Sequence, residues 1–139
     1  MYVDGFDKEI IDYLLDVFQK MKIINVSVNS YVAAQDVYEI RFENDEIVLQ
    51  FYYRKEQPDC EAQVNITNIL IQGNYKGKGI SKKIINSLID YCDNHGTMAL
   101  LICDLINRSW CQYLLNKGGR LLQAETLYEG AIVHLPKKL

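Results

Sequence analysis

The sequence has few residues of the kinds that build metal sites. Its only two histidines stand at positions 95 and 134, and neither has a second ligand at the spacing that zinc sites use. The four cysteines, at positions 60, 92, 103 and 111, include no Cys-x-x-Cys pair and lie in apolar surroundings. We therefore expect no metal, and we expect the cysteines to be core thiols of a cytoplasmic protein.

An excess of positive charge and a long apolar run are also missing. The net charge is −3 and the pI about 5.3, so overall electrostatics give no support to nucleic-acid binding. No apolar stretch approaches the roughly 20 residues of a membrane helix. The segment Met1–Gly5 lacks the basic start and apolar run of a signal peptide. We expect neither nucleic acid nor a membrane as partner.

What is present indicates one folded domain over residues 1–139. Hydrophobic residues make up 49% of the chain and charged residues 24%, which is typical of a globular protein with a real core. No internal repeat, low-complexity run or linker interrupts it. Helical and strand-like patterns both occur, so the expected fold class is α+β.

Helical periodicity marks two long segments. The first runs from Phe6 to Met21, with Asp4 as the expected N-cap, and the second from Ile80 to Asn94, stopped at His95-Gly96. A third, short helix is expected after a cap at Asn107 or Ser109, ending at Gly118-Gly119. The first helix is expected to pack on the sheet.

Strand patterns fill the remaining segments. Alternation from Ile24 to Asn29 predicts the first strand, and Asn44-Asp45 is expected to form a hairpin turn that tolerates positive φ. The run 98–103 is apolar throughout and follows a crossover helix, so it is expected to be a central strand parallel to the fourth. The other expected strands are Val37–Glu43, Glu46–Arg54, Glu61–Ile71, Arg120–Glu125 and Ala131–Leu135.

A glycine-rich stretch, Gln72–Ser81, lies between the fourth strand and the second long helix. Such a turn exposes backbone N–H groups at the positive end of a helix, which suits a phosphate. No Asp, Thr or Asn stands near Gly77–Gly79 to cap the helix, and Lys76 and Lys78 add positive charge. The alternative is a tight strand-to-helix connection with two solvated lysines.

The spacing excludes two common phosphate motifs. A Walker A loop needs four residues between its first glycine and Gly-Lys, but Gly73 and Gly77-Lys78 enclose three. The dinucleotide fingerprint needs a glycine where Lys82 stands. The stretch from Tyr75 to Ile80 instead resembles the pyrophosphate loop of the GNAT superfamily of acyl-CoA-dependent N-acetyltransferases. That loop is usually Gln/Arg-x-x-Gly-x-Gly/Ala, and Asn74 occupies its Gln/Arg position.

The resemblance implies a fold and a co-substrate. The fold would be a mixed sheet of about six to seven strands flanked by about three to four helices, with the fourth and fifth strands parallel and splayed. Acetyl-CoA would bind without a metal, its pantetheine arm along the backbone of the fourth strand. The residues that the resemblance assigns to CoA are Ile69, Leu70, Ile71, Asn74, Lys76, Gly77, Lys78, Gly79, Ile80, Ser81 and Asn107.

The resemblance also directs attention to possible catalytic groups. The family tyrosine would stand at position 114, which is leucine here, so Tyr113 is the candidate to protonate the leaving thiolate. Core packing with Trp110 and Leu114 is its alternative role. Asp104, at the exit of the fifth strand, is the better-placed acid, although it could merely cap the next turn. Glu61 is the only carboxylate on the fourth strand but lies at its far end.

Three functions remain open from the sequence. The first is transfer of an acetyl group from acetyl-CoA to a primary amine by direct attack in a ternary complex. The second is a non-catalytic CoA-binding or interaction domain on the same fold, and the third a nucleotide-binding regulator. The amine acceptor cannot be read from the sequence. Glu125 and Glu129 could hold a cationic acceptor or face water, and a homodimer is possible.

Overall fold

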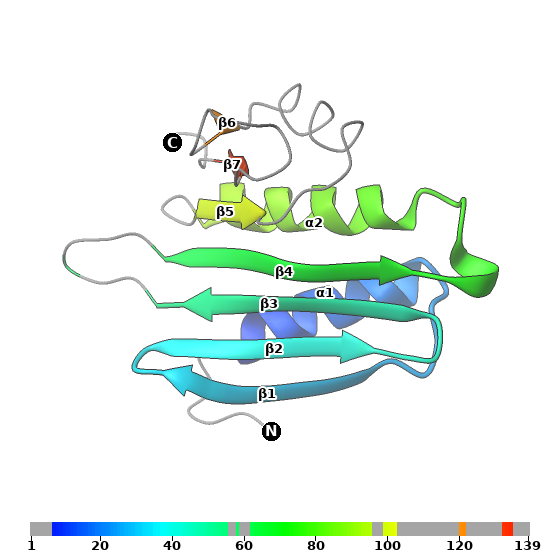
Figure 1. Ribbon diagram of the computed structural model, residues 1–139, viewed down its shortest axis with the longest axis horizontal. Helices are drawn as coiled ribbons and strands as arrows, with labels where there is room; N and C mark the ends of the chain where they lie inside the picture. The colour runs from blue at the N-terminus through cyan, green and yellow to red at the C-terminus, as the bar shows by residue number, and fades with distance from the viewer. Residues whose placement is uncertain are drawn as a thin grey trace.

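Strands of one sheet form the frame of the protein (Figure 1). The computed structural model describes residues 7–55, 58 and 62–95, and the backbone of strands at 99–102, 120–121 and 132–134. Neighbouring strands follow the order β1-β2-β3-β4-β5-β7-β6. Their bounds are β1 Ser27–Ala34, β2 Val37–Glu43, β3 Ile47–Arg54, β4 Gln63–Ile71, β5 Ala99–Ile102, β6 Arg120–Leu121 and β7 Ile132–His134. In the described part of the chain, two α-helices, α1 (Lys8–Lys20) and α2 (Ile80–Asn94), accompany the sheet.

The first four strands are antiparallel neighbours, which confirms the predicted meander and the α+β class. β5 pairs in parallel with the first half of β4, from Gln63↔Ala99 to Ile66↔Ile102. The predicted bounds of β2 and α2 are confirmed to the residue, because both have a regular apolar period. None of the described helices is long and apolar enough to cross a membrane.

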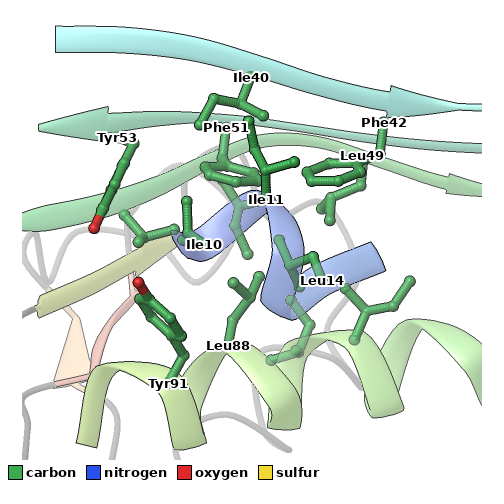
Figure 2. Close-up of a cluster of buried hydrophobic side chains, with 14 of the residues drawn as sticks. Ile10, Ile11, Leu14, Ile40, Phe42, Leu49, Phe51, Tyr53, Leu88 and Tyr91 are labelled. Carbon is green, nitrogen blue, oxygen red and sulfur yellow. The ribbon is translucent and has the colours of Figure 1, made fainter. Parts of the chain in front are cut away.

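Apolar side chains gather where the helices meet the sheet (Figure 2). Leu14 of α1 and Leu88 of α2 are both fully buried, in one cluster with the inward side chains of the strands. Phe42 of β2 lies between Phe18 and Phe51, with ring centroids at 5.6 and 6.1 Å. The helical stripes predicted from the sequence therefore do form the core.

The other face of the strands is polar and half-exposed. Along β2 and β3 buried residues alternate with half-buried ones, as a one-sided sheet requires. Glu39 accepts hydrogen bonds from the Tyr31 hydroxyl and from Gln50 Nε2. Arg41 Nη1 donates to Gln50 Oε1 at 3.0 Å. These contacts link β1, β2 and β3. A one-residue slip of register would turn these polar side chains into the core.

A bulge divides β4 into two halves. Gln50 and Phe51 of β3 pair with Asn68 and Ile66, so Thr67 has no partner in the ladder. Before the bulge Val64 and Ile66 are buried in the core. After it, Ile69 pairs with Leu49, which is itself buried. The extra residue thus keeps apolar side chains toward the core on both sides of position 67.

The β2–β3 turn forms at the predicted place, and it does not use the positive φ that its residues would tolerate. Positive φ occurs, among described residues other than glycine, at Lys22, Asn25 and Asp36, and not at Asn44 or Asp45. The Asn44 side chain makes the turn instead: Oδ1 accepts from the backbone N–H groups of Glu46 and Ile47, both at 2.8 Å. Its Nδ2 donates to the carbonyl of Ile24 at 2.9 Å.

Asn44→Ala should therefore lower the free energy of unfolding by about 1–2 kcal/mol, because two backbone donors lose their acceptor. Asn44→Ser should lose less, since a hydroxyl can make the same kind of turn more weakly. Urea denaturation of the three proteins measures the difference. Equal stability of the alanine variant and the wild type would contradict this role of the amide.

β3 and β4 begin one and two residues later than predicted, at Ile47 and Gln63, and the predicted starts of α1 and β1 are also wrong. α1 begins at Lys8 with Asp7 in the N-cap position, so Asp4 is not its cap. The buried Asp7 carboxylate accepts from the Ser30 hydroxyl rather than capping the helix. β1 begins at Ser27 and not at Ile24, because Asn25 has a φ of 59°, which interrupts an extended chain.

Candidate functional site

The glycine-rich connection has the predicted order of strand, turn and helix. After β4, a short 3₁₀ turn covers Gly73–Tyr75, and α2 begins at Ile80. Gly77 and Gly79 have φ values of 80° and 71°, in the left-handed region that side chains with a Cβ rarely adopt. Gly79 is the N-cap of α2, and no side chain caps the helix there, as predicted.

Backbone donors are available at this turn. In the described part of the chain, no acceptor is in hydrogen-bonding geometry with the N–H groups of residues 77–81. Ile80 and Ser81 belong to the first turn of α2, whose N–H groups have no partner within a helix. The helix dipole adds a partial positive charge at the same end. A phosphate oxygen is the natural acceptor for such donors.

A cavity of about 490 Å³ opens beside these donors. Most of the predicted CoA residues contribute to its wall: Ile69, Leu70, Ile71, Lys76, Gly77, Gly79, Ile80 and Ser81. Lys78 and Asn74 do not line it. Two lining residues, Tyr75 and Lys82, were not predicted. Lys82 could have been predicted as a lining residue, because it stands in the first turn of α2 and helical side chains tilt toward the N-terminus, where the exposed N–H groups lie.

The end of β4 forms the apolar side of this cavity. Pairing with β5 ends at Ile66, directly before the bulge at Thr67. Among the described residues, the second half of β4 therefore has a strand partner only on the β3 side. Leu70 is 44% exposed there, and it belongs to the few large apolar side chains that are exposed among the described residues. An extended ligand could lie along this edge and use the backbone of β4.

A second hollow, of about 550 Å³, is lined mainly by the β2–β3 turn and the chain before β1, and it shares Tyr75 with the first. Asn74 lines this second hollow, where its backbone N–H donates to Glu46 Oε2 at 2.8 Å. Its side-chain Nδ2 also points to Glu46, at 3.5 Å from Oε1. The structure thus places Asn74 against the β2–β3 turn and not in the wall of the first cavity.

The predicted catalytic groups lie outside the described residues. This holds for Asp104 and Tyr113, for the CoA candidate Asn107, and for the other acids considered, Glu61, Glu125 and Glu129. Of the cysteines, only Cys92 is described, and it is buried as predicted. Burial, and to a lesser degree the charge of Asp93, raise the pKa of the Cys92 thiol to about 12. A thiol in that state is not a nucleophile at neutral pH.

Comparison with solved structures settles the architecture. Naa50 from Arabidopsis thaliana, in complex with the bisubstrate analogue CoA-Ac-MVNAL, aligns over 92% of this chain and 93% of its own, with a TM-score of 0.51. The chain has the GNAT fold. Sequence identity to Naa50 is only 14%, so the likeness concerns the fold and not the reaction.

Two further GNAT-fold structures align with lower scores. Arabidopsis thaliana NAA60 in complex with a bisubstrate analogue is 11% identical, over 93% of this chain and 94% of its own, with a TM-score of 0.48. A GNAT-family acetyltransferase from Staphylococcus aureus Mu50 is 14% identical, over 98% and 96%, with a TM-score of 0.46. No protein-family model matches the sequence, and no curated protein sequence matches it significantly.

Proposed function

We propose that this chain is a single-domain N-acetyltransferase that moves an acetyl group from acetyl-CoA to a primary amine. The observation that carries the proposal is the row of N–H groups at residues 77–81, which have no acceptor in the described part of the chain and lie beside a cavity at the end of β4. The GNAT fold supports it, because the donors occupy the turn where the GNAT pyrophosphate loop is expected. Lys76 and Lys82 add positive charge for the phosphates.

The proposal assigns the pantetheine arm to the edge of β4. Ile69–Ile71 would offer backbone groups to it, and β4 and β5 would diverge beyond Ile66 to admit the thioester. Such an arrangement places the carbonyl between two strands, where backbone N–H groups can polarise it. Asn107 would contact the cofactor from the chain that follows β5.

The chemical step is a direct displacement. The amine nitrogen attacks the thioester carbonyl, so that a C–N bond forms and the C–S bond breaks. A lysine-like amine with a pKa near 10.4 is mostly protonated at pH 7 and must first lose a proton, which Asp104 would accept directly or through water. Tyr113 would give a proton to the departing thiolate and would regain one from the nitrogen, directly or through water, as the amide forms. Tyr113→Phe should therefore lower kcat, and full kcat in that variant would remove the role.

Ligand-dependent stability tests the first half of the proposal. CoA and acetyl-CoA at about 100 times Kd should raise the free energy of unfolding by about 2.7 kcal/mol, which is a shift of several degrees in Tm. ATP and NAD serve as controls and should give no shift. Stabilisation by ATP or NAD but not by CoA would indicate a nucleotide-binding regulator instead.

Thiol release tests the second half. Acetyl-CoA is incubated with the protein and a panel of primary amines: a small diamine, an aminoglycoside, a lysine peptide, and a peptide of sequence MVNAL, chosen because Naa50 binds an analogue that contains it. Amine-dependent release of CoA, followed with a thiol reagent, would support catalysis. Stabilisation by CoA without release for any amine would indicate a CoA-binding domain that does not catalyse.

A further inference from the structure

Glu46, in the turn between β2 and β3, contacts the beginning of the glycine-rich loop. Its backbone carbonyl accepts from the N–H of Gln72 at 2.8 Å, which extends the β3–β4 ladder by one step. Its side-chain Oε2 accepts from the N–H of Asn74 at 2.8 Å. Glu46 is thus bonded to the loop on both sides of Gly73.

Gly73 fits this contact in a way that no other residue would. A Cβ at position 73 would lie 2.6 Å from Glu46 Oε2 and 2.7 Å from its carboxyl carbon. Gly73 also has a φ of 62°, which favours glycine independently of the space. The carboxylate therefore lies directly against the loop backbone, as the acceptor for the first turn that follows β4.

The half-buried Glu46 is itself held in place. Asn44 Oδ1 accepts from the N–H of Glu46 at 2.8 Å, so the β2–β3 turn fixes the backbone from which the carboxylate extends. The side-chain amide of Asn74 adds a second, longer contact to Oε1. A continuous set of hydrogen bonds consequently runs from Asn44 through Glu46 to Asn74, three residues before the exposed donors begin at residue 77.

We propose that Glu46 is a positioning residue that holds the loop in its anion-binding conformation. By fixing Asn74, it fixes the 3₁₀ turn from which Lys76 and the N–H groups of residues 77–81 follow. This inference rests on the proposed function for the identity of the anion, CoA. The negative charge of Glu46 would by itself weaken phosphate binding at this site. Glu46 therefore favours binding through its hydrogen bonds to the loop and not through its charge.

Three variants separate the hydrogen bond from the charge. Glu46→Ala removes both, and Glu46→Gln removes the charge but keeps one oxygen that can accept from Asn74. Glu43→Ala is the matched control, because it removes a neighbouring carboxylate that pairs with Arg41 and that, among the described residues, makes no hydrogen bond or ion pair to the loop. We expect Glu46→Ala to raise the Kd for CoA and the KM for acetyl-CoA about 10-fold or more, the usual cost of a lost bond to a charged group.

The kinetic pattern distinguishes positioning from general damage. Kcat should change less than about 2-fold in Glu46→Ala, because the loop binds the cofactor and takes no part in the proton transfers. Glu46→Gln and Glu43→Ala should bind CoA as well as the wild type, or better at low salt. If Glu46→Ala bound CoA as tightly as the Glu43→Ala control, the positioning role would be overturned.

Amide hydrogen exchange gives a readout that needs no ligand. The N–H of Asn74 should exchange faster in Glu46→Ala than in Glu43→Ala, while the N–H groups of β2 and β3 keep their protection. Unchanged exchange at Asn74 would overturn the inference whatever the affinity for CoA. If the wild type bound no CoA, the proposed function would fail, and selective loss of protection at Asn74 would still support the placement of the loop by Glu46.

Discussion

Gly77→Glu should reduce the affinity for CoA by at least about 100-fold, which corresponds to ~2.7 kcal/mol. Gly77 lines the cavity beside the unbonded N–H groups, and a Cβ there would meet no protein atom within 4 Å. The fold can therefore accept a side chain at this position, whereas a bound diphosphate would meet both its bulk and its negative charge. The positive φ of Gly77 adds a strain of about 1–2 kcal/mol to any variant with a Cβ.

Gly77→Asn is the matched control for that strain. Asparagine enters the left-handed region more readily than other residues with a Cβ, and it carries no charge. Isothermal titration with CoA, and urea denaturation without it, should show a much smaller loss of affinity for asparagine than for glutamate at comparable stability. An unchanged Kd in Gly77→Glu would mean that CoA, if it binds, does not use this loop.

Phe42→Ala should have the largest effect on stability, a loss of about 3–5 kcal/mol. Phe42 is fully buried, and its ring lies between Phe18 of α1 and Phe51 of β3. Removing it leaves a cavity between the helix and two strands, in a protein whose total stability is expected to be about 5–15 kcal/mol. Secondary structure should persist at low temperature, but the midpoint of urea denaturation should fall sharply.

Two comparisons make the result for Phe42 interpretable. Phe42→Leu should lose less, since leucine fills much of the same space. Val32→Ala, at a half-exposed position on β1, should change stability by no more than about 0.5 kcal/mol. A similar loss for all three variants would contradict the arrangement of the core around Phe42.

The parts of the fold that were predicted correctly depend on local patterns. The bounds of α2 follow from an apolar period that begins at Ile80 and from the glycines that precede it. β2 alternates strictly between Val37 and Glu43, so its bounds were also correct. The glycine-rich turn was recognisable because φ above zero and an uncapped helix start are both encoded in the residues themselves.

The errors arise where side chains distant in sequence decide the local structure. Asp7 lies at the start of α1, but its carboxylate accepts a hydrogen bond from the Ser30 hydroxyl of β1. Helix-capping rules consider only residues near the helix end, so they cannot predict this partner. For Asn74 the assignment to the cofactor stays a prediction, but the motif gave no indication that its backbone N–H donates to Glu46. That pairing joins two turns that are far apart in the sequence, and one sequence carries no signal for it.

The bulge at Thr67 determines which changes of sequence β4 can accept. Val64 and Ile66 point inward at even positions, whereas Ile69 and Ile71 pair with inward residues at odd ones, so the two halves of β4 are out of phase by one residue. Deleting Thr67 would join the two halves in one regular alternation with Ile69 and Ile71 still inward, so it would remove the bulge without turning the segment beside the cavity. Position 67 should thus accept both substitution and deletion, and a deletion would change the irregular backbone beside the cavity and not the core.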